Sequence, residues 1–214
     1  MARRTYDISP PIDERLNVWP GDVAYTRTVT GHIKTGSTVT TSVIRSTTHM
    51  GSHADAPSHY GADAPTIDMM PLDLYIGECQ LITVNAPRAT RVMPEQVEAA
   101  IEAPRVIIRT GTFPDFKNWN KDFAALSPEL VDLMFEMGVK LIGVDAPSVD
   151  LFDSKDLPAH KAFLRHEMAI IEGLVLADIP DGMYELIALP LKLIGCDASP
   201  VRAVLRELEH PTAG

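Results

Sequence analysis

Residues 49–59 read His-Met-Gly-Ser-His-Ala-Asp-Ala-Pro-Ser-His, and the chemistry of the chain is concentrated in this stretch. Three imidazoles (His49, His53, His59) and one carboxylate (Asp55) all fall at odd-numbered positions in it. On a flat strand all four would face one side, but a rise of about 3.3 Å per residue would hold His49 and His53 roughly 13 Å apart. Nitrogen ligands bind zinc at about 2.0–2.1 Å, so one ion could not reach both imidazoles. A metal site here therefore requires the chain to curl.

Gly51 and Pro57 give the chain the means to curl, because glycine tolerates unusual dihedral angles and proline interrupts helices and ladders. A helix would also bring His49 and His53 together, but the same two residues disfavour it. The alternative is a polar loop with incidental histidines, which the dense grouping argues against. Imidazole and carboxylate ligands suit Zn²⁺ first, with Mn²⁺ or Fe²⁺ as alternatives. Neither cysteine lies nearby, so an open catalytic site is favoured over a closed structural one.

The composition is that of a folded globular protein of 214 residues, enough for one domain. A formal net charge of −10 argues against nucleic acid and against a strongly anionic substrate. No run approaches the roughly 20 apolar residues of a membrane-spanning helix, and Met1–Asp7 lacks the apolar core of a secretory signal. Cys79 and Cys196 are too few for a disulfide framework, so we expect buried thiols and a reducing cytoplasm.

The first half of the chain is rich in β-forming residues, and the second half alternates between strand and helix patterns. The predicted strands are Asp7–Ser9, Ala24–Thr30, Ser37–Thr48 (half-buried), Cys79–Val84, Arg105–Arg109, Leu141–Val144, Met168–Ile171 and Tyr184–Leu189. The predicted helices are Pro94–Ile101, a helix capped by Ser127 and ended by Gly138, and a closing helix Pro200–Leu208. Seventeen scattered prolines indicate irregular loops rather than a regular doubly wound sheet.

The stretch at 49–59 resembles the pattern His-x-Gly-Thr-His-x-Asp-x-Pro-x-His of the cyclase-type metal hydrolases. Ser52 is the one departure, and it keeps the hydroxyl of the usual threonine. Within that family the chain looks like the bacterial kynurenine formamidases (arylformamidases). The supporting segments are Asp7-Ile8-Ser9, Trp19-Pro20-Gly21-Asp22, Gly143-Val144-Asp145-Ala146-Pro147-Ser148-Val149-Asp150 and Ile170-Ile171-Glu172.

We predict an α/β fold: a single domain, residues 1–214, with a mixed, strand-rich β/β/α layered (swivelling-domain-like) architecture. The resemblance implies two zinc ions per subunit, with Mn²⁺ as the alternative metal. His49, His53 and Asp55 would hold the first ion, and Asp55 would bridge to a second held by His160 and Glu172. Spacing alone does not choose His160 over His166, nor Glu172 over Glu167.

The resemblance assigns acid–base chemistry to His59, whose imidazole can take and return a proton near neutral pH. A further metal ligand is the alternative role for this residue. Trp19 is implied as a ring that stacks on an aryl group of the substrate, unless it only plugs the rim of the core. Trp119, between Asn118 and Asn120, is expected to be a loop residue.

The implied reaction is hydrolysis of a small molecule, N-formyl-L-kynurenine, to L-kynurenine and formate, by a homodimer. Relatives with the same motif open cyclic amides such as isatin, and a metal-binding relative without catalysis is a further alternative. A nucleophilic serine is disfavoured, because the chain has no Gly-x-Ser-x-Gly elbow, and Ser52 and Ser58 lie in no strand–turn–helix pattern.

Overall fold

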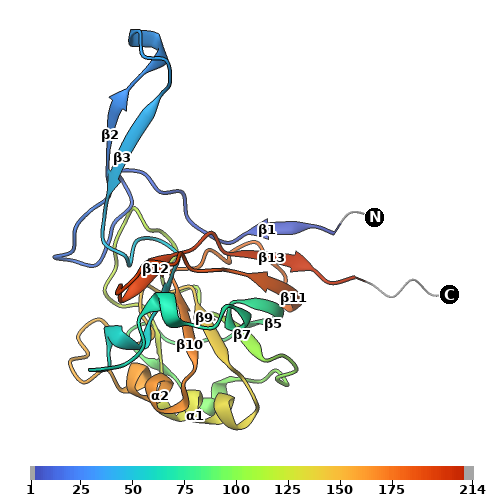
Figure 1. The fold of residues 1–214 in the computed structure, drawn as a ribbon. Coiled ribbons are helices and arrows are strands. Elements are labelled where there is room, and N and C mark those ends of the chain that lie inside the picture. Colours follow the sequence, from blue (N-terminus) through green and yellow to red (C-terminus); the bar gives the residue numbers. More distant parts are fainter. Residues whose placement is uncertain (1–2, 210–214) are drawn as a thin grey trace.

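A nine-stranded mixed sheet forms the body of the protein (Figure 1). The computed structural model describes residues 3–209. The four central strands run parallel: β5 (Ile76–Thr83), β7 (Arg105–Arg109), β9 (Leu141–Val144) and β10 (Ala169–Glu172). Antiparallel strands extend the sheet at both sides: β11 (Gly182–Ile187), β13 (Val204–Glu207) and β1 (Thr5–Asp7) beyond β5, and β4 (His53–Asp55) and β12 (Ala198–Pro200) beyond β10.

Two helices, α1 (Pro128–Glu136) and α2 (Pro158–His166), lie side by side against one face of the sheet (Figure 1). The side chains of successive β7 residues point to opposite faces of the sheet. Val106 and Ile108 join the core under the helices, whereas Ile107 joins the core on the opposite face. The antiparallel strands curl around this second core. The strand-rich α/β fold is therefore as predicted.

The other elements are short. Strands β6 (Arg91–Val92) and β8 (Ala125–Leu126) pair with each other, and 3₁₀ turns occur at Ile33–Thr35, Pro57–His59, Ile67–Met69, Leu72–Leu74 and Pro94–Gln96. Ser127 caps α1 as predicted, because its Oγ accepts a hydrogen bond from the amide of Leu130. Cys79 is buried as expected, whereas Cys196 is partly exposed. Within residues 3–209, no helix has the length and apolar character needed to cross a membrane.

Two predicted helices are wrong. In place of a helix at Pro200–Leu208, residues Val204–Glu207 form β13 between β11 and β1, because these partners bury Leu205 completely and pair Arg206 with Glu185 at 2.6 Å. This tertiary strand pairing outweighs the local helix propensity of the segment. The predicted helix Pro94–Ile101 stops after Gln96, whose side chain accepts from the Met93 amide and donates to the carbonyl of Asn85. Helix α2, in contrast, was not predicted.

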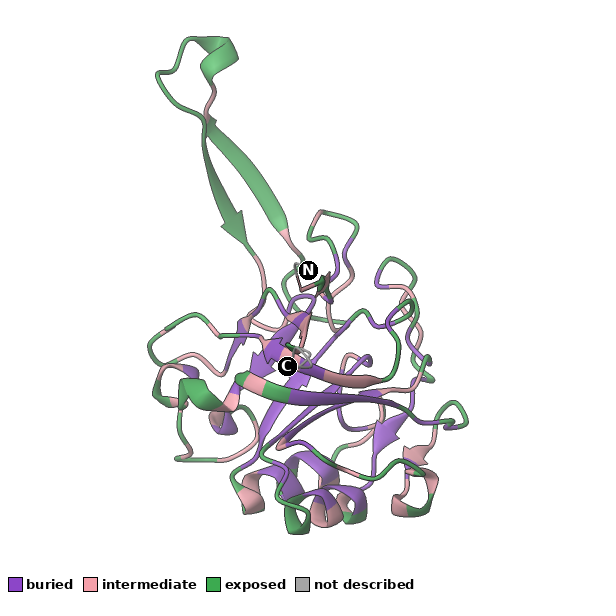
Figure 2. Ribbon diagram, turned by 90° about the vertical axis from the view of Figure 1, so that its right-hand side faces the viewer, coloured by how far each residue is buried: buried purple, intermediate pink, exposed green. Residues whose placement is uncertain are grey.

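Strands β2 (Thr26–Gly31) and β3 (Thr41–Arg45) form a hairpin that projects from the body (Figures 1 and 2). The prediction of strands in this region is confirmed, but the prediction of half-burial is wrong. All five residues of β3 are exposed. Nothing in the described part of the chain covers the hairpin's apolar side chains.

Candidate metal and active site

The chain bends sharply just before β4. The ring centroids of His49 and His53 lie 5.0 Å apart, far less than a flat strand would allow, and Gly51 has a φ of +60°. The predicted curl is thus confirmed. It is confined to the residues before His53, because His53–Asp55 is itself a strand, paired with β10 and β12.

Backbone contacts hold this bend against the end of β10. A Cβ atom on Gly173 would lie 2.3 Å from the carbonyl oxygen of Gly51, so only glycine fits there. Ser52, next in the chain, donates a 2.7 Å hydrogen bond to the carbonyl of Gly173. Because of this close approach, His53 stands directly opposite Glu172 in the β4–β10 register.

Asp55 lies at the centre of the imidazoles. Its carboxylate is buried, and neither oxygen has a hydrogen-bond partner among the described residues. Three imidazole nitrogens nevertheless lie close to it. His49 Nδ1 is 3.1 Å and His53 Nε2 is 3.4 Å from Oδ1, and His160 Nε2 is 3.5 Å from Oδ2. Orphaned carboxylate oxygens facing converging nitrogens fit a divalent cation, since a buried unpaired charge is otherwise costly.

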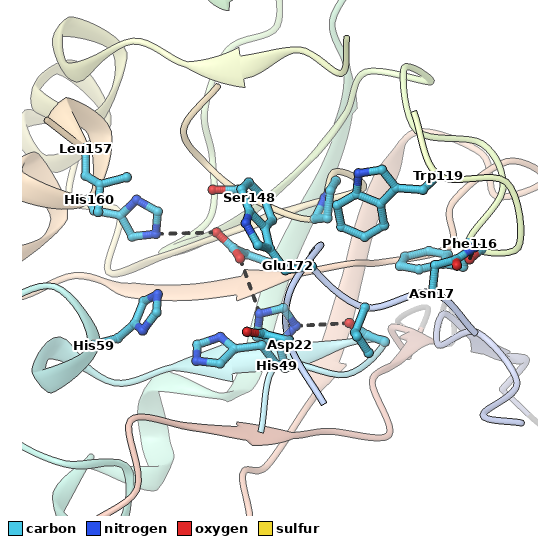
Figure 3. Close-up of a pocket in the computed structure, with 15 residues that line it drawn as sticks. Asn17, Asp22, His49, His59, Phe116, Trp119, Ser148, Leu157, His160 and Glu172 are labelled. Atoms are coloured by element: carbon cyan, nitrogen blue, oxygen red, sulfur yellow. Dashed lines mark hydrogen bonds and ion pairs between the residues drawn. The ribbon is translucent and has the colours of Figure 1, made fainter. Parts of the chain in front are cut away.

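Glu172 and His160 complete this group from two other elements (Figure 3). Glu172, the last residue of β10, has Oε2 3.3 Å from His53 Nε2 and Oε1 3.7 Å from His160 Nε2. The competing candidates lie elsewhere: His166 pairs with Asp132 at 2.7 Å, and Glu167 is exposed after the end of α2. All five predicted metal ligands therefore come together, and the two rejected residues do not join them.

The electrostatics of the group favour positive charge. Burial disfavours the ionised form of Asp55, but the neighbouring imidazoles outweigh it and hold the pKa of this carboxyl well below its usual range. Burial likewise opposes protonation of the imidazoles, yet Asp55 and Asp197 raise the pKa of His49 to about 9. Asp150 and Asp55 raise the pKa of His160 to about 10. The carboxylates of this group therefore favour a positive charge at its centre.

His59 stands at the mouth of the site, and its side chain is 35% exposed. Its ring centroid is 4.3 Å from that of His49 and 6.1 Å from that of His160. One ligand atom each from Asp55, His59 and His160 fall within 4.8 Å of one another, so the geometry permits either an acid–base or a ligand role. Asp197, which sequence reasoning missed, lies 3.0 Å from His49 Nε2 and 3.6 Å from His59 Nδ1.

Aromatic side chains form the wall of the pocket above these groups (Figure 3). Trp19 lines the pocket and stacks on Phe152 with 5.0 Å between centroids. Trp119 also lines it, edge-on to Trp19 at 5.8 Å, and its buried Nε1 has no hydrogen-bond partner among the described residues. Trp119 lies in a loop, as predicted, and its side chain contributes to the pocket wall. Phe116 is a further wall residue that the sequence did not reveal.

Residues 6–151 match the family model Cyclase, which covers the histidine stretch and more than half of the chain. The chain belongs to the cyclase family.

Solved structures agree on the fold of this cyclase-family chain. One, described as a potential metal-dependent hydrolase with cyclase activity, is 27% identical over 98% of this chain and 100% of its own, with a TM-score of 0.84. Another, described as a predicted metal-dependent hydrolase from Bacillus stearothermophilus, is 27% identical over 97% of this chain and 100% of its own, with a TM-score of 0.82. Isatin hydrolase A from Labrenzia aggregata shares the fold at 21% identity, covering 97% of this chain and 94% of its own, with a TM-score of 0.82.

Each histidine that faces Asp55 also has a partner on its other ring nitrogen. For His53 it is the carbonyl of Gly51, 3.0 Å from Nδ1. For the other two histidines the partner is an aspartate: Asp197 Oδ2 lies 3.0 Å from His49 Nε2, and Asp150 Oδ2 lies 2.8 Å from His160 Nδ1. Such partners fix the ring orientation of metal-ligating histidines. Neither aspartate was assigned a role from the sequence, because Asp197 has no local signal and Asp150 appears only within the segment Gly143–Asp150 that supports the family resemblance.

Proposed function

We propose that this cyclase-family chain is a zinc-dependent arylformamidase, which hydrolyses N-formyl-L-kynurenine to L-kynurenine and formate. The observation that carries the proposal is the orphaned carboxylate of Asp55, surrounded by three imidazoles at the base of an aromatic pocket. A cation-binding group beneath a wall that suits an aryl ring matches the needs of this reaction.

In this proposal His49, His53 and Asp55 would hold one ion, and His160 and Glu172, with Asp55, would hold a second. Mixed imidazole and carboxylate ligands suit Zn²⁺, with Mn²⁺ as the alternative. Bound divalent metal would supply Lewis-acid chemistry, which lowers the pKa of water towards about 7 and polarises a carbonyl oxygen.

His59 is the acid–base residue of the proposal. It lies beside the predicted ligands but is more exposed than His49 or His160, so a substrate can reach it. The leaving group is an aryl amine, whose expulsion as an anion is costly. His59, after accepting a proton from the attacking water, returns it to that nitrogen.

The aromatic wall and one carboxylate of the pocket support this substrate. Trp19 and Trp119 offer faces and edges for an aryl ring. Asp22 is a lining carboxylate outside the predicted metal group. Asp22 suits the ammonium group of N-formylkynurenine. Isatin has no such cation, although its ring also fits the wall, and it is therefore the substrate against which the proposal is tested.

The test compares N-formyl-L-kynurenine with isatin by ultraviolet absorbance, using protein stripped with a chelator and then reloaded with Zn²⁺ or Mn²⁺. We expect metal-dependent turnover of the formamide. His59→Ala should lower turnover by roughly 10²–10⁴-fold with metal content intact. His166→Ala, which removes a histidine paired with Asp132 outside the site, is the matched control. Preference for isatin would overturn the substrate, and loss of metal in His59→Ala would make His59 a ligand.

The proposal includes a homodimer, for which the hairpin β2–β3 is the contact. Residues 23–48 contain three basic residues and no acid, so this segment carries +3 while the remainder of the chain carries −13. Opposite charges favour association of the hairpin with the body of a second copy. Apolar side chains on the hairpin would be covered there: Val29, Ile33, Val39, Val43 and Ile44. A reducing cytoplasmic setting also belongs to the proposal, supported by the free thiols of Cys79 and Cys196.

A further inference from the structure

Asp150 lies next to the predicted metal group but outside it, and it is completely buried. Its two oxygens accept four hydrogen bonds. Oδ2 accepts from the backbone amide of His160 at 3.0 Å and faces His160 Nδ1 at 2.8 Å. Oδ1 accepts from Arg91 Nη1 at 2.7 Å and from the backbone amide of Ala159 at 3.3 Å. Every described neighbour that bonds to this carboxylate can act as a donor.

Two of these bonds replace a missing helix cap. Leu157, at the N-cap position of α2, has a left-handed backbone (φ 45°, ψ 56°) and a side chain that cannot cap. The amides of Ala159 and His160 belong to the first turn of α2, where backbone donors have no partner within the helix. Asp150 satisfies them from another segment, so it fixes where α2 begins and hence where His160 stands.

The bond to Nδ1 determines which ring nitrogen carries the proton when the His160 imidazole is neutral. A carboxylate facing Nδ1 favours the tautomer with hydrogen on Nδ1, which leaves the lone pair of Nε2 free. Nε2 is the nitrogen that faces Asp55 at 3.5 Å and Glu172 at 3.7 Å. The preceding residue acts on the same group, because the amide of Val149 donates to Glu172 Oε1 at 2.7 Å.

We infer that Asp150 is a positioning residue for metal binding, which presents Nε2 of His160 as a ligand by holding both its ring and its tautomer. The inference rests on the proposed metal site. Asparagine keeps one acceptor oxygen of aspartate and replaces the other with a donor. Because Oδ2 serves both Nδ1 and the backbone amide of His160, this change alters the tautomer and one cap bond together, and the hydrogen on the ring has to be measured directly.

In Asp150→Asn the amide group must point its NH₂ to one of two sides. Towards Arg91 it would meet a guanidinium cation that donates, so the carbonyl oxygen is needed on that side. The NH₂ then faces His160, and Nδ1 has to accept a hydrogen bond instead of donating one. The imidazole proton moves to Nε2 and blocks the nitrogen that faces Asp55.

The experiment measures the Zn²⁺ affinity of the full chain by competition with a chromogenic chelator. We expect Asp150→Asn to weaken it by about 10- to 100-fold. Ser127→Ala is the matched control, because it removes the cap of α1, which packs against α2, without touching His160. It should lower thermal stability and leave the affinity unchanged. Equal affinities in wild type and Asp150→Asn would overturn the inference.

A second measurement needs no variant of Asp150, so it decides the matter even if that variant fails to fold. Long-range ¹⁵N–¹H spectra of the metal-free protein report which ring nitrogens of each histidine carry hydrogen before a metal can impose the answer, with His160 assigned from the signals missing in His160→Gln. We expect hydrogen on His160 Nδ1, which faces Asp150. An Nδ1 without hydrogen would overturn the inference, whereas a wild type that binds no zinc in the chelator competition would instead overturn the proposed function.

Discussion

Gly173→Ala should disrupt the predicted metal group without altering any of its ligands. Gly173 follows Glu172, has a φ of +71°, and approaches Gly51 in the bend that precedes β4. An added methyl group would lie 2.3 Å from the carbonyl oxygen of Gly51 and 3.0 Å from its carbonyl carbon. Both are backbone atoms, so no side-chain rotation can relieve the overlap.

The size of the effect follows from these distances. An ordinary contact begins near 3.4 Å, so the carbonyl of Gly51 must move by about 1 Å. The left-handed backbone costs a non-glycine residue about 1–2 kcal/mol, and overpacking adds about 1–3 kcal/mol. We therefore expect the free energy of unfolding to fall by about 2–5 kcal/mol. Metal–ligand distances tolerate only about 0.2 Å, so a shift of this size two residues before His53 should weaken zinc binding at least tenfold.

Chemical denaturation of the metal-free protein and chelator competition measure the two quantities separately. Gly195→Ala is the matched control, since Gly195 has a φ of +75° and no atom within 4 Å of its added Cβ. It should lose only the backbone term, about 1–2 kcal/mol, and bind zinc as wild type does. If both variants have the same stability and the same zinc affinity, the close approach of the two backbones does not hold the site together.

Three further results are expected. Asp22→Asn should raise the KM for N-formyl-L-kynurenine by roughly tenfold, which corresponds to about 1.4 kcal/mol. The KM for N-formylaniline, which lacks the ammonium group, should not change. Equal effects on both substrates would rule out a charge contact. Ser52→Ala should lower the free energy of unfolding by about 1–3 kcal/mol in denaturation, because the buried carbonyl of Gly173 loses its 2.7 Å hydrogen bond, whereas Ser52→Thr keeps it. The double variant Ile33→Asp, Val39→Asp on the hairpin should be a monomer by light scattering, with helix content unchanged. A dimer of unaltered affinity would exclude the hairpin as the contact.

The sequence predicted those parts of the fold whose stability is local or fully buried. Strands Arg105–Arg109 and Leu141–Val144 were placed correctly because both faces of a central parallel strand are covered, which gives an unbroken apolar run. The region Val204–Glu207 was misassigned because its strand exists only through pairing with β11 and β1. The exposure of the hairpin also escaped prediction, since β-forming composition does not reveal whether a neighbouring surface covers it.

For the candidate site, the sequence indicated the candidate ligands that are close together along the chain, but not the residues that the fold brings to them. The spacing within 49–59 indicated a metal group and the bend it requires. His160 and Glu172 came only from the family resemblance, because nothing local distinguishes them from His166 and Glu167. The roles of Asp150 and Trp119 were not predicted for a related reason: that of Asp150 depends on its contacts across the fold, and that of Trp119 on a pocket that the sequence does not describe.

The sheet register explains how these distant residues meet. Strand β4 runs antiparallel to β10, so His53 lies opposite Glu172 and Asp55 lies opposite Ile170. His53 and Asp55, two residues apart, project from the same face of β4, where His160 also reaches Asp55. A slip of one residue would turn both side chains to the opposite face. The hydrogen bond from Ser52 and the contact at Gly173 lock this register at the point where the strands separate, so the motif at 49–59 encodes both the candidate ligands and the pairing that brings Glu172 to them.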